Sequence, residues 1–487
     1  MNKSIEALAP SCIWKNFKSL TQIPRPSKKE TRVVAFIRKF GEELGLETFV
    51  DEVGNVVIRK PATPGYENRK GVILQSHLDM VPQKNSDKKH DFEKDPIEPY
   101  VDGEWVKANG TTLGADNGIG VAAMMALLEA RDLVHGPLEA LFTIDEETGM
   151  TGAFALTPEL LKGDILLNLD SEDEGELYVG CAGGVDANIE FPYKAQQVPA
   201  GFLPFSIRIS GLKGGHSGLD ISLGRGNSNL ILFRLLNKTM KEAGARLCEA
   251  EGGNMRNAIP REAHAIVIVP SGKEKVFTEL VKQLAQVIRK EFSGTEPDLT
   301  IECSSTALPG RVMTEELQRN FVSAVFSSPN GTIRMSDGIP GLVETSTNLA
   351  IVKTEETVIR IHCLLRSSVD SAKENLAETM QAFFEMAGAT IKFAGSYPGW
   401  KPNMNSPIMK TMNKVYHAMY HKEPEIKAVH AGLECGIIGG VYPDLDMISF
   451  GPTIRHPHSP DEKVHIESVQ KFWDFLAETL KNAPVKK

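Results

Sequence analysis

Histidine and acidic side chains follow short apolar runs in this chain, and such side chains can bind metal ions. His77 and Asp79 come after the apolar run 71–74, and Asp170 comes after the apolar run 164–169. An imidazole is a good zinc ligand, and a carboxylate beside it can hold the second ring nitrogen and fix its tautomer. A single His-x-Asp is common by chance, and alone it is more simply a satisfied polar pair. The repetition at several strand ends is what indicates a site.

Three adjacent acids, Asp145, Glu146 and Glu147, follow the apolar run 137–144. Like charges this close raise one another's pKa unless a cation is near. Acidic runs are usually solvated loops, and that interpretation stays open, but the position behind a buried strand favours metal binding or catalysis. In extended chain, Glu146 and Glu147 would point in opposite directions, so one could bind metal while the other takes a proton from water.

A glycine-rich loop at 110–120 runs into the apolar helix expected at 121–130 and contains Asp116. The loop lacks the Gly-Lys-Ser/Thr ending of a phosphate loop, and Asp116 would repel a phosphate. A plain helix N-cap is the other interpretation of Asp116, and it stays open on this feature alone. Near the end of the chain, His458 lies in the run His-Pro-His-Ser-Pro.

These residue types suit a hydrolase with two metal ions. Such an enzyme needs one carboxylate shared by both ions, one or two further ligands on each, and a separate base for the attacking water. Two ions about 3.5–4 Å apart lower the pKa of a bridging water toward ~7. Mixed histidine and carboxylate ligands suit catalytic zinc and, less tightly, cobalt or manganese. The candidate ligands are His77, Asp116, Asp170, one acid of the run 145–147, and His458.

The elements that would position these residues indicate an α/β sheet. Apolar strands separated by helical segments each deliver an acid or a histidine at their carboxyl ends, where open α/β sheets collect ligands. Ser27 and Glu30 have the spacing of a capping box, which predicts a helix over 28–44. A hairpin with Asp-Gly at its turn is expected at 100–106.

From about residue 185 the pattern changes to strands that alternate apolar and polar residues, as one-faced antiparallel strands do. Long amphipathic helices are expected near 227–241, 273–292 and 371–386. The two halves of this segment share a similar plan, which predicts an internal duplication. After residue 400 the α/β pattern returns, with helices expected at 407–420 and 466–480. We therefore expect a first catalytic segment at 1–185, an inserted α+β lid or dimerisation domain at 186–400, and a second catalytic segment at 401–487.

Composition excludes some classes of function. The 487 residues include 54 Lys plus Arg and 63 Asp plus Glu, a net charge of −9, which gives no support for nucleic-acid or anionic-membrane binding. No apolar run approaches the roughly 20 residues of a membrane span, and the N-terminal residues 1–6 have no signal-peptide core behind them. The six scattered cysteines form no CxxC, which predicts reduced thiols in a cytoplasmic protein.

Taken together, the motifs resemble those of the co-catalytic zinc peptidase family of carnosinase, aminoacylase and carboxypeptidase G. The resemblance spans the whole chain and is carried by residues 77–79, 110–120, 145–149, 170–172, 181–184, 214–218, 256–262, 430–436 and 457–460. It implies a catalytic domain with a mixed sheet flanked by helices, a lid domain inserted into it, and two zinc ions per chain. It also implies hydrolysis of dipeptides, especially those with a C-terminal histidine, by a homodimer.

The resemblance also implies the ligand set by position. Asp116 would bridge the two ions, His77 and Asp170 would hold one, and Glu147 and His458 would hold the other.

It implies three further roles around the ions. Asp79 would orient His77, and Glu146 would be the general base that later protonates the leaving amine. His216, on the inserted domain, would reach the active site on closure and stabilise the oxyanion. Without the resemblance, a mobile histidine in a glycine-rich turn is the preferred interpretation of His216.

Substrate-binding residues are predicted where the chain departs from the family pattern. Many dimeric relatives carry an arginine in the strand that here reads His-Ala-Ile-Val-Ile-Val at 264–269, with none. We expect Arg366 to bind the substrate carboxylate instead, because a guanidinium fork suits a carboxylate; a surface salt bridge is the alternative. Asn257 could contact the scissile carbonyl, and Glu434 could receive a free amino group. The competing functions are a broader deacylase or carboxypeptidase on the same scaffold, and an inactive relative that only binds.

Overall fold

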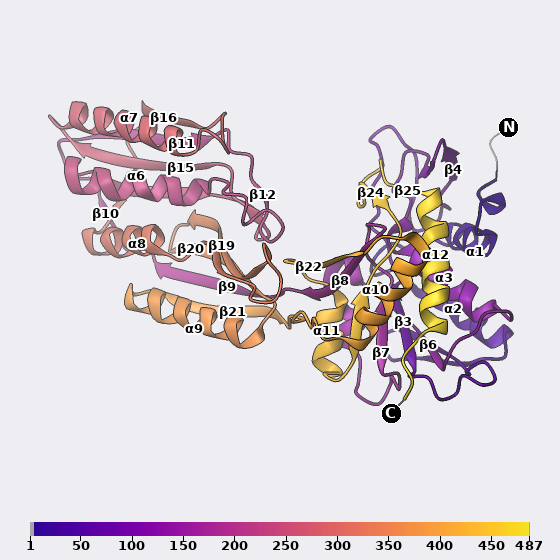
Figure 1. The fold of residues 1–487 in the computed structure, drawn as a ribbon. Helices are drawn as coiled ribbons and strands as arrows, with labels where there is room; N and C mark the ends of the chain where they lie inside the picture. The colour runs from indigo at the N-terminus through magenta and orange to yellow at the C-terminus, as the bar shows by residue number, and fades with distance from the viewer. Residues whose placement is uncertain (1–3, 487) are drawn as a thin grey trace. The chain divides into compact units, whose positions relative to one another are not determined.

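The structure is a computed structural model that describes residues 4–486. The first three residues, part of the segment expected to lack a signal peptide, lie outside the described range. The chain divides into two compact units (Figure 1). Unit 1 comprises Met1–Cys181, Trp400–Ala428 and Leu433–Lys487, and unit 2 comprises Ala182–Gly399 and Val429–Gly432. The boundaries expected from the sequence were 185 and 400.

Unit 1 is built on an eight-stranded mixed sheet whose centre is parallel. In spatial order the strands are β1 (Glu47–Val50), β2 (Val56–Lys60), β6 (Leu138–Thr143), β3 (Val72–His77), β7 (Ile165–Asn168), β23 (Asp446–Ser449), β8 (Glu176–Cys181) and β22 (Glu425–Val429). β3 pairs in parallel with β6 and β7, and β7 pairs in parallel with β23. β3, β6 and β7 are buried along their whole length, as parallel strands covered on both faces are. Their carboxyl ends therefore open at one edge.

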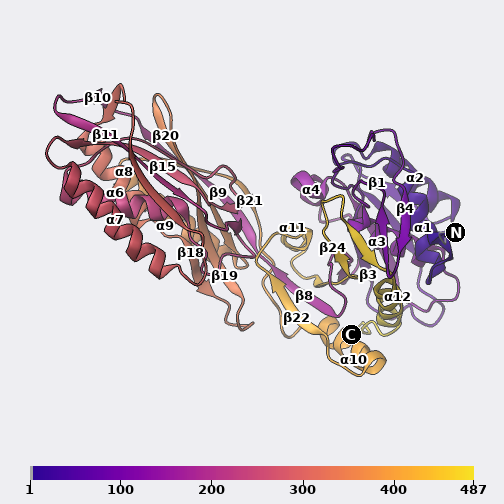
Figure 2. The same cartoon turned by 90° about the horizontal axis from the view of Figure 1, so that it is seen from above.

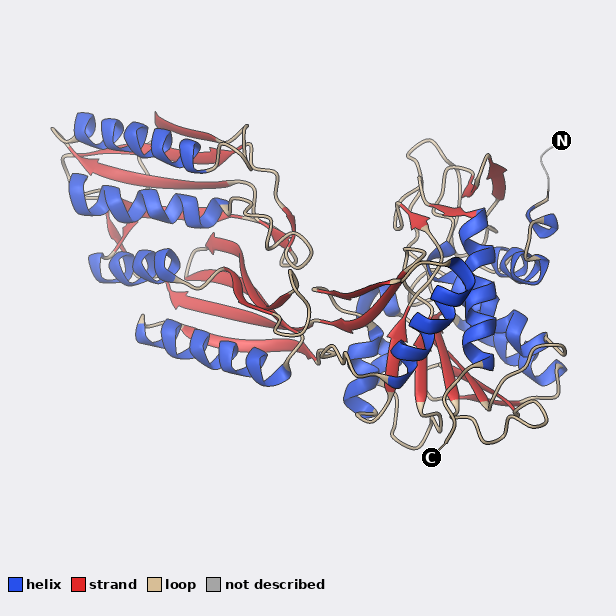
Figure 3. Cartoon of the chain, in the orientation of Figure 1, coloured by secondary structure: helices blue, strands red, loops and turns tan. Residues whose placement is uncertain are grey.

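Helices flank this sheet (Figure 3). They are α1 (Ser11–Thr21), α2 (Thr31–Glu43), α3 (Ala115–Glu129), α10 (Pro407–Tyr420), α11 (Glu434–Val441) and α12 (Ile466–Lys481). α3 is apolar on all sides and almost wholly buried because it packs between α1 and β3. Among residues 4–486, none of the helices is both long and apolar enough to cross a membrane.

A second, four-stranded sheet in unit 1 carries the loop that contains His458. The expected hairpin forms as β4 (Pro99–Asp102) and β5 (Trp105–Ala108), and β25 (Lys463–His465) pairs with β5. β24 (Ile454–Arg455) completes the sheet by pairing with β25. The loop between β24 and β25 is thereby anchored at both ends.

The prediction of a capping box at Ser27 and Glu30 is wrong. α2 begins at Thr31, with Glu30 as its N-cap residue and no side-chain cap. The Ser27 hydroxyl donates instead to Asp79 Oδ2 at 2.8 Å, and Glu30 Oε1 accepts the backbone N–H of Asp145 at 3.2 Å. Both side chains serve tertiary contacts near the strand ends, which local spacing does not reveal.

Unit 2 is a one-faced antiparallel sheet with four helices on one side (Figure 2). The helices are α6 (Ser228–Ala243), α7 (Glu274–Glu291), α8 (Glu315–Ser327) and α9 (Asp370–Met386). In spatial order the strands are β16 (Thr300–Ser305), β11 (Phe202–Ser210), β15 (Ala263–Pro270), β13 (Arg246–Gly252), β19 (Val343–Thr354), β20 (Val358–Ser367), β9 (Gly183–Pro192) and β21 (Thr390–Tyr397), with β18 (Gly331–Met335) paired to β19. Burial alternates along β9 and β11, so one face packs under the helices.

The duplication expected from the sequence is visible in the topology of unit 2. One half runs β11–α6–β13–β15–α7–β16, and the other runs β9–α8–β19–β20–α9–β21. Each half has the same spatial strand order, and the two halves meet where β13 pairs with β19. The first half is inserted after β9 of the second, so the repeat is not sequential in the chain.

Candidate metal centre and active site

The first group at the strand edge of unit 1 consists of His77, Asp116 and Asp170. His77 ends β3, and Asp170 lies two residues past β7. His77 Nε2 is 3.2 Å from Asp116 Oδ1 and 3.3 Å from Asp170 Oδ1. The His77 side chain is only 1% exposed. Parallel pairing of β3 with β7 is what places these two ends together.

The second group consists of Asp116, Glu147 and His458. His458 Nε2 is 3.2 Å from Asp116 Oδ2 and 3.0 Å from Glu147 Oε2. Asp116 therefore turns one carboxylate oxygen to each histidine. It does not cap α3: Gly114 is the N-cap residue without a side-chain cap, and Asp116 itself has non-helical φ and ψ of −81° and 111°.

The two groups fit divalent cations. Within each, one ligand atom per residue can be chosen so that all lie within 4.8 Å of one another. Among the described residues, Glu147 Oε1 is buried without a hydrogen-bond donor, and Asp170 Oδ1 has only the His77 ring, at 3.3 Å. Among residues 4–486, no lysine or arginine forms an ion pair with Asp116, Glu147 or Asp170. Buried carboxylates without a cationic partner are costly, and bound metal would remove that cost.

The carboxylates of the cluster also favour protons on its two histidines. Burial disfavours a charged His77, but Asp170 and Asp116 outweigh it and raise the pKa of His77 well above its usual value. Hydrogen bonds to Asp116 and Glu147 raise the pKa of His458 to about 11. Burial raises the pKa of Asp170 to about 6. Because a coordinated imidazole must be neutral, metal binding must release these protons, and affinity should rise with pH.

Asp79 supports both His77 and the acidic run. Its Oδ1 is 3.3 Å from His77 Nδ1 and accepts the Glu146 N–H at 3.0 Å, while Oδ2 accepts the Glu147 N–H at 3.2 Å. The contact with His77, then the hydrogen bonds from the Ser27 hydroxyl and the Glu146 N–H, outweigh burial and lower the pKa of Asp79 to about 2. The same carboxylate thus orients the ring of His77 and holds the backbone of Glu146 and Glu147 in place.

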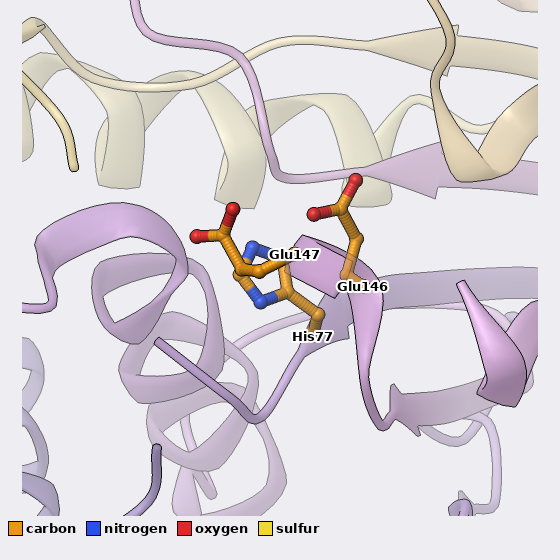
Figure 4. Close-up of side chains that lie close together, drawn as sticks. All are labelled: His77, Glu146 and Glu147. Carbon is orange, nitrogen blue, oxygen red and sulfur yellow. The ribbon is translucent and has the colours of Figure 1, made fainter. Parts of the chain in front are cut away.

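Glu146 and Glu147 differ in direction, but not for the reason that the sequence suggested. They lie in a short helix, α4 (Glu146–Gly149), and not in extended chain, because Asp145 takes a left-handed conformation with φ 53°. The Glu147 carboxylate lies to one side of the His77 ring, and the Glu146 carboxylate points in a different direction (Figure 4), although an oxygen of each acid lies within 4.8 Å of a His77 ring nitrogen. Burial, with added repulsion from Asp170, raises the pKa of Glu146 well above its usual value, which suits a base working near neutrality.

His216 and Asn257 lie together in unit 2. His216 belongs to β12 (Gly215–His216), which pairs with β14 (Ala258–Ile259), and Asn257 directly precedes β14. His216 Nδ1 accepts the N–H groups of Gly218 and Leu219 at 3.1 and 3.0 Å. Burial and the charge of Arg366 lower the pKa of His216. The ring is therefore neutral, with its proton on Nε2 as a donor.

Arg366 lies on β20 of the same unit and is 5% exposed. Its Nη1 donates to the Tyr397 hydroxyl at 3.0 Å, and its Nε has no hydrogen-bond partner in the described chain. No carboxylate of residues 4–486 lies within ion-pair distance of it, so the surface salt bridge considered above does not form. A buried guanidinium without a carboxylate partner can accept one from a ligand.

A model of peptidase family M20/M25/M40 matches residues 73–482, from β3 to the end of α12. The chain belongs to this family. It is 47% identical over 482 residues to the cytosol non-specific dipeptidase of Escherichia coli (strain K12), which covers 99% of both chains. Aminoacylhistidine dipeptidase from Vibrio alginolyticus matches with a TM-score of 0.95 and 48% identity over 100% of this chain and 99% of that one. Aminopeptidase PepT from Bacillus cereus ATCC 10987 shares the fold alone. It matches with a TM-score of 0.57 and 16% identity over 98% of this chain and 99% of that one.

The M20/M25/M40 match confirms the expected fold class and establishes that the chain is a peptidase. It also confirms the family resemblance carried by the motifs. The roles of individual residues remain predictions, and the structure brings five of them, His77, Asp116, Glu147, Asp170 and His458, into one cluster in unit 1.

Glu434 of the M20/M25/M40 peptidase begins α11 in unit 1 and is 1% exposed. Its Oε2 accepts hydrogen bonds from Gln75 Nε2 at 2.6 Å and Thr143 Oγ1 at 2.8 Å, while Oε1 has no partner among the described residues. Burial raises the pKa of Glu434 to about 8.

Buried polar residues beneath the strand ends were not predicted. Gln75 and Asn168 are paired in register two residues before His77 and Asp170, and Asn168 Nδ2 donates to Gln75 Oε1 at 2.5 Å. Polar residues in the otherwise apolar strands β3 and β7 were the available signal. Arg25 and Glu462 were also missed, and nothing in their local sequence marks them.

In this peptidase, His77→Ala should weaken metal binding more than Asp79→Ala does. His77 faces the metal group directly, whereas Asp79 acts through the ring and the backbone of residues 146 and 147. Loss of such a supporting carboxylate weakens metal binding about 10–100-fold, and loss of a ligand should exceed that. Competition with a chromophoric chelator measures both affinities. Equal and total metal loss in both variants would show that the two roles are misassigned.

His430→Gln should flatten the pH dependence of stability. The imidazole of His430 is 5% exposed, donates or accepts one hydrogen bond with Ser346 Oγ at 2.7 Å, and faces Arg366 and His216. Burial, then the charge of Arg366, lowers the pKa of His430 to about 3, against ~6.5 when unfolded. Between these values the unfolded chain binds the extra proton, so stability falls as pH drops, by about 2 kcal/mol from pH 7 to 5.

Urea unfolding at pH 7 and pH 5 measures this difference. The exposed His417→Gln serves as the matched control and should keep the pH dependence of the unsubstituted protein. If the free energy of unfolding of His430→Gln changes between pH 7 and pH 5 as much as that of the control, the lowered pKa of His430 would be contradicted.

Proposed function

We propose that this M20/M25/M40 peptidase hydrolyses dipeptides, especially those with a C-terminal histidine, at a centre of two zinc ions. The observation that carries the proposal is Asp116, which offers one oxygen to each of two ligand groups. His77 and Asp170 complete one group, and Glu147 and His458 complete the other. Cobalt or manganese would suit the same ligands.

Glu146 is the proposed general base. Ions held by the cluster would polarise the peptide carbonyl and lower the pKa of a water molecule. Glu146 takes the proton of the attacking water and passes it to the leaving amine. Its placement beside His77 and Glu147, and its raised pKa, support this role.

Three residues are proposed to bind the substrate from unit 2. His216 donates its Nε2–H to the oxyanion that develops on the scissile carbonyl. Arg366 binds the C-terminal carboxylate, and Asn257 contacts the carbonyl. The proposal requires these groups and the metal cluster to act on one substrate, within one chain or between two copies in a homodimer.

Glu434 is proposed to receive the substrate's free amino group through Oε1. The enclosure of this carboxylate means that the contact requires it to become accessible. The cytosolic dipeptidase at 47% identity supports a cytoplasmic location and small peptide substrates.

Arg366→Gln should raise KM for dipeptides at least about tenfold and leave KM for dipeptide amides nearly unchanged, because only the former carry the carboxylate. Arg360→Gln, on the exposed part of β20, is the matched control. Steady-state kinetics on both substrate types decide the point, and an equal effect on both would contradict a carboxylate contact. In the same assay, unchanged dipeptide KM in Glu434→Gln or Asn257→Ala would remove that residue from the proposal.

A substrate panel tests the proposed function itself. The protein is stripped with a chelator, zinc is restored, and kcat/KM is measured for β-alanyl-histidine, other Xaa-His dipeptides, dipeptides without histidine, tripeptides and N-acyl amino acids. Glu146→Gln prepared in parallel controls for contaminating peptidases. We expect dipeptides to be preferred, and Xaa-His most of all. Preference for acylated or longer substrates would support a deacylase or carboxypeptidase, and no hydrolysis at all would support an inactive relative.

A further inference from the structure

Glu462 lies four residues after His458 and is 2% exposed. Its carboxylate accepts four consecutive backbone N–H groups of the loop that leads to Asp116. Oε2 accepts from Leu113 at 2.7 Å and Gly114 at 2.9 Å, and Oε1 accepts from Ala115 at 2.7 Å and Asp116 at 3.2 Å. One side chain thus joins the His458 loop to the backbone of the residue shared by both ligand groups.

The start of α3 lacks any local substitute for this carboxylate. The first N–H groups of a helix have no partner within the helix, and they attract negative charge. A side chain at the N-cap residue usually accepts one of them, but here that residue is Gly114. The cap is supplied from 346 residues further along the chain.

Arg25 holds the other side of the same loop. It is 2% exposed, and its Nη1 donates to the carbonyl oxygens of Leu78 at 2.8 Å and Asp79 at 3.0 Å. Its Nη2 donates to the carbonyl oxygen of Gly114 at 2.6 Å. The guanidinium therefore ties the backbone that follows His77 to the loop that carries Asp116.

Two glycines leave the space that this guanidinium occupies. A Cβ at Gly114 would lie 2.7 Å from Arg25 Nη2, and a Cβ at Gly118 would lie 2.6 Å from it. Gly114 also has a φ of +69°, which favours glycine, whereas Gly118 has no such requirement. For Gly118, close approach of the Arg25 side chain is thus a sufficient reason for glycine.

We propose that Arg25 and Glu462 are positioning residues that set the two halves of the metal centre separately. Arg25 fixes Asp116 relative to His77, and Glu462 fixes Asp116 relative to His458. The inference rests on the proposed two-ion site. Because Asp116 turns one oxygen to each histidine, an error on either side should weaken the ion on that side first.

A purely structural role would predict a different result. Buried charges with hydrogen-bonded partners stabilise a fold when both partners are present, and their loss lowers stability whatever the metal content. Such a loss would weaken both ions alike. The distinguishing measurement is therefore which ion is weakened, and not stability or activity.

The experiment is a set of Zn2+ titrations of chelator-stripped protein, with a chromophoric competitor, in two backgrounds. The unsubstituted chain should bind two ions, and His458→Ala should bind one. Glu462→Gln keeps the size of the side chain but turns an NH2 group to two of the N–H donors. In the unsubstituted background it should weaken one ion about 10–100-fold, and in the His458→Ala background it should change the remaining ion less than about threefold.

Arg25→Lys replaces the forked guanidinium group by a single ammonium group, and it should affect the other ion. It should weaken the ion that remains in His458→Ala about 10–100-fold. The exposed Asp461→Asn and Arg32→Lys are the matched controls and should leave both ions unchanged. If Glu462→Gln does not fold, Glu462→Asp, which keeps the charge and shortens the reach, is judged by the same criterion.

Two outcomes would overturn the inference: equal weakening of the ion in both backgrounds, or native affinity for both ions in Glu462→Gln and Arg25→Lys. Failure of the proposed function looks different, because the unsubstituted chain would then bind fewer than two ions, or His458→Ala would bind as many as the unsubstituted chain.

Discussion

Glu146→Gln is expected to lower kcat for dipeptide hydrolysis by at least about a hundredfold while two metal ions stay bound. Glutamine has nearly the same size and shape as glutamate but cannot take a proton from water. Glu147, the neighbouring acid, faces His458 at 3.0 Å and belongs to the ligand groups, so the metal cluster keeps its carboxylates. The raised pKa of Glu146 indicates a site where a proton can be accepted and returned near neutral pH.

Two measurements on the same sample check this expectation: kcat for β-alanyl-histidine, and zinc content by elemental analysis. Glu159→Gln, an exposed residue of unit 1, is the control for the loss of one negative charge and should keep full activity. Near-native turnover in Glu146→Gln would overturn the assignment of the base. Inactivity with loss of zinc would instead show that Glu146 is needed to hold the ions.

Asp116→Asn should weaken both ions, in contrast to substitution of any other candidate ligand. Asp116 is the only member of both the His77–Asp170 group and the Glu147–His458 group. Its contacts with His458 and His77 outweigh burial and hold the pKa of the Asp116 carboxyl well below its usual range, so it offers a charged oxygen to each side. The neutral amide offers one oxygen and one NH2 group. Affinity for both ions should fall by more than the roughly 10–100-fold typical of a supporting residue.

Zinc titration of the stripped variant gives both affinities, and activity at saturating zinc gives the functional consequence. Asp132→Asn, exposed just beyond α3, controls for the change in charge. Loss of only one ion in Asp116→Asn would mean that the carboxylate serves one site and that the shared role belongs elsewhere.

The cluster of candidate ligands could be predicted because residue types that bind metal follow apolar strands in the sequence. In β3 and β7 the apolar run stops and a histidine or acid follows within three residues, and parallel pairing then brings those ends to one edge. His458 was a candidate ligand from its residue type, but its assignment to one ion came only from the family resemblance, because its loop reaches the cluster from a different sheet.

The remaining residues depend on contacts that local sequence does not encode. Ser27 has the spacing of a capping box, but Asp79 offers its hydroxyl a buried acceptor that a helix start cannot match. Glu146 and Glu147 were expected in extended chain, whereas the left-handed Asp145 turns them into a short helix. Arg25 and Glu462 form hydrogen bonds with backbone groups far away in the chain. Because nearly every residue carries the same backbone groups, the sequence does not reveal such a partner.

The place of β23 in the sheet has a consequence for the order in which the protein can be made. This strand lies between β7 and β8, yet it is synthesised after the whole of unit 2, and His458 and Glu462 follow it. At roughly 5–20 residues per second, β3, β6 and β7 wait tens of seconds on the ribosome for the strand that separates β7 from β8. A nascent chain therefore carries an unfinished sheet, with an open parallel edge on β7, until β23 has been made, and the ligand cluster can be completed only after that.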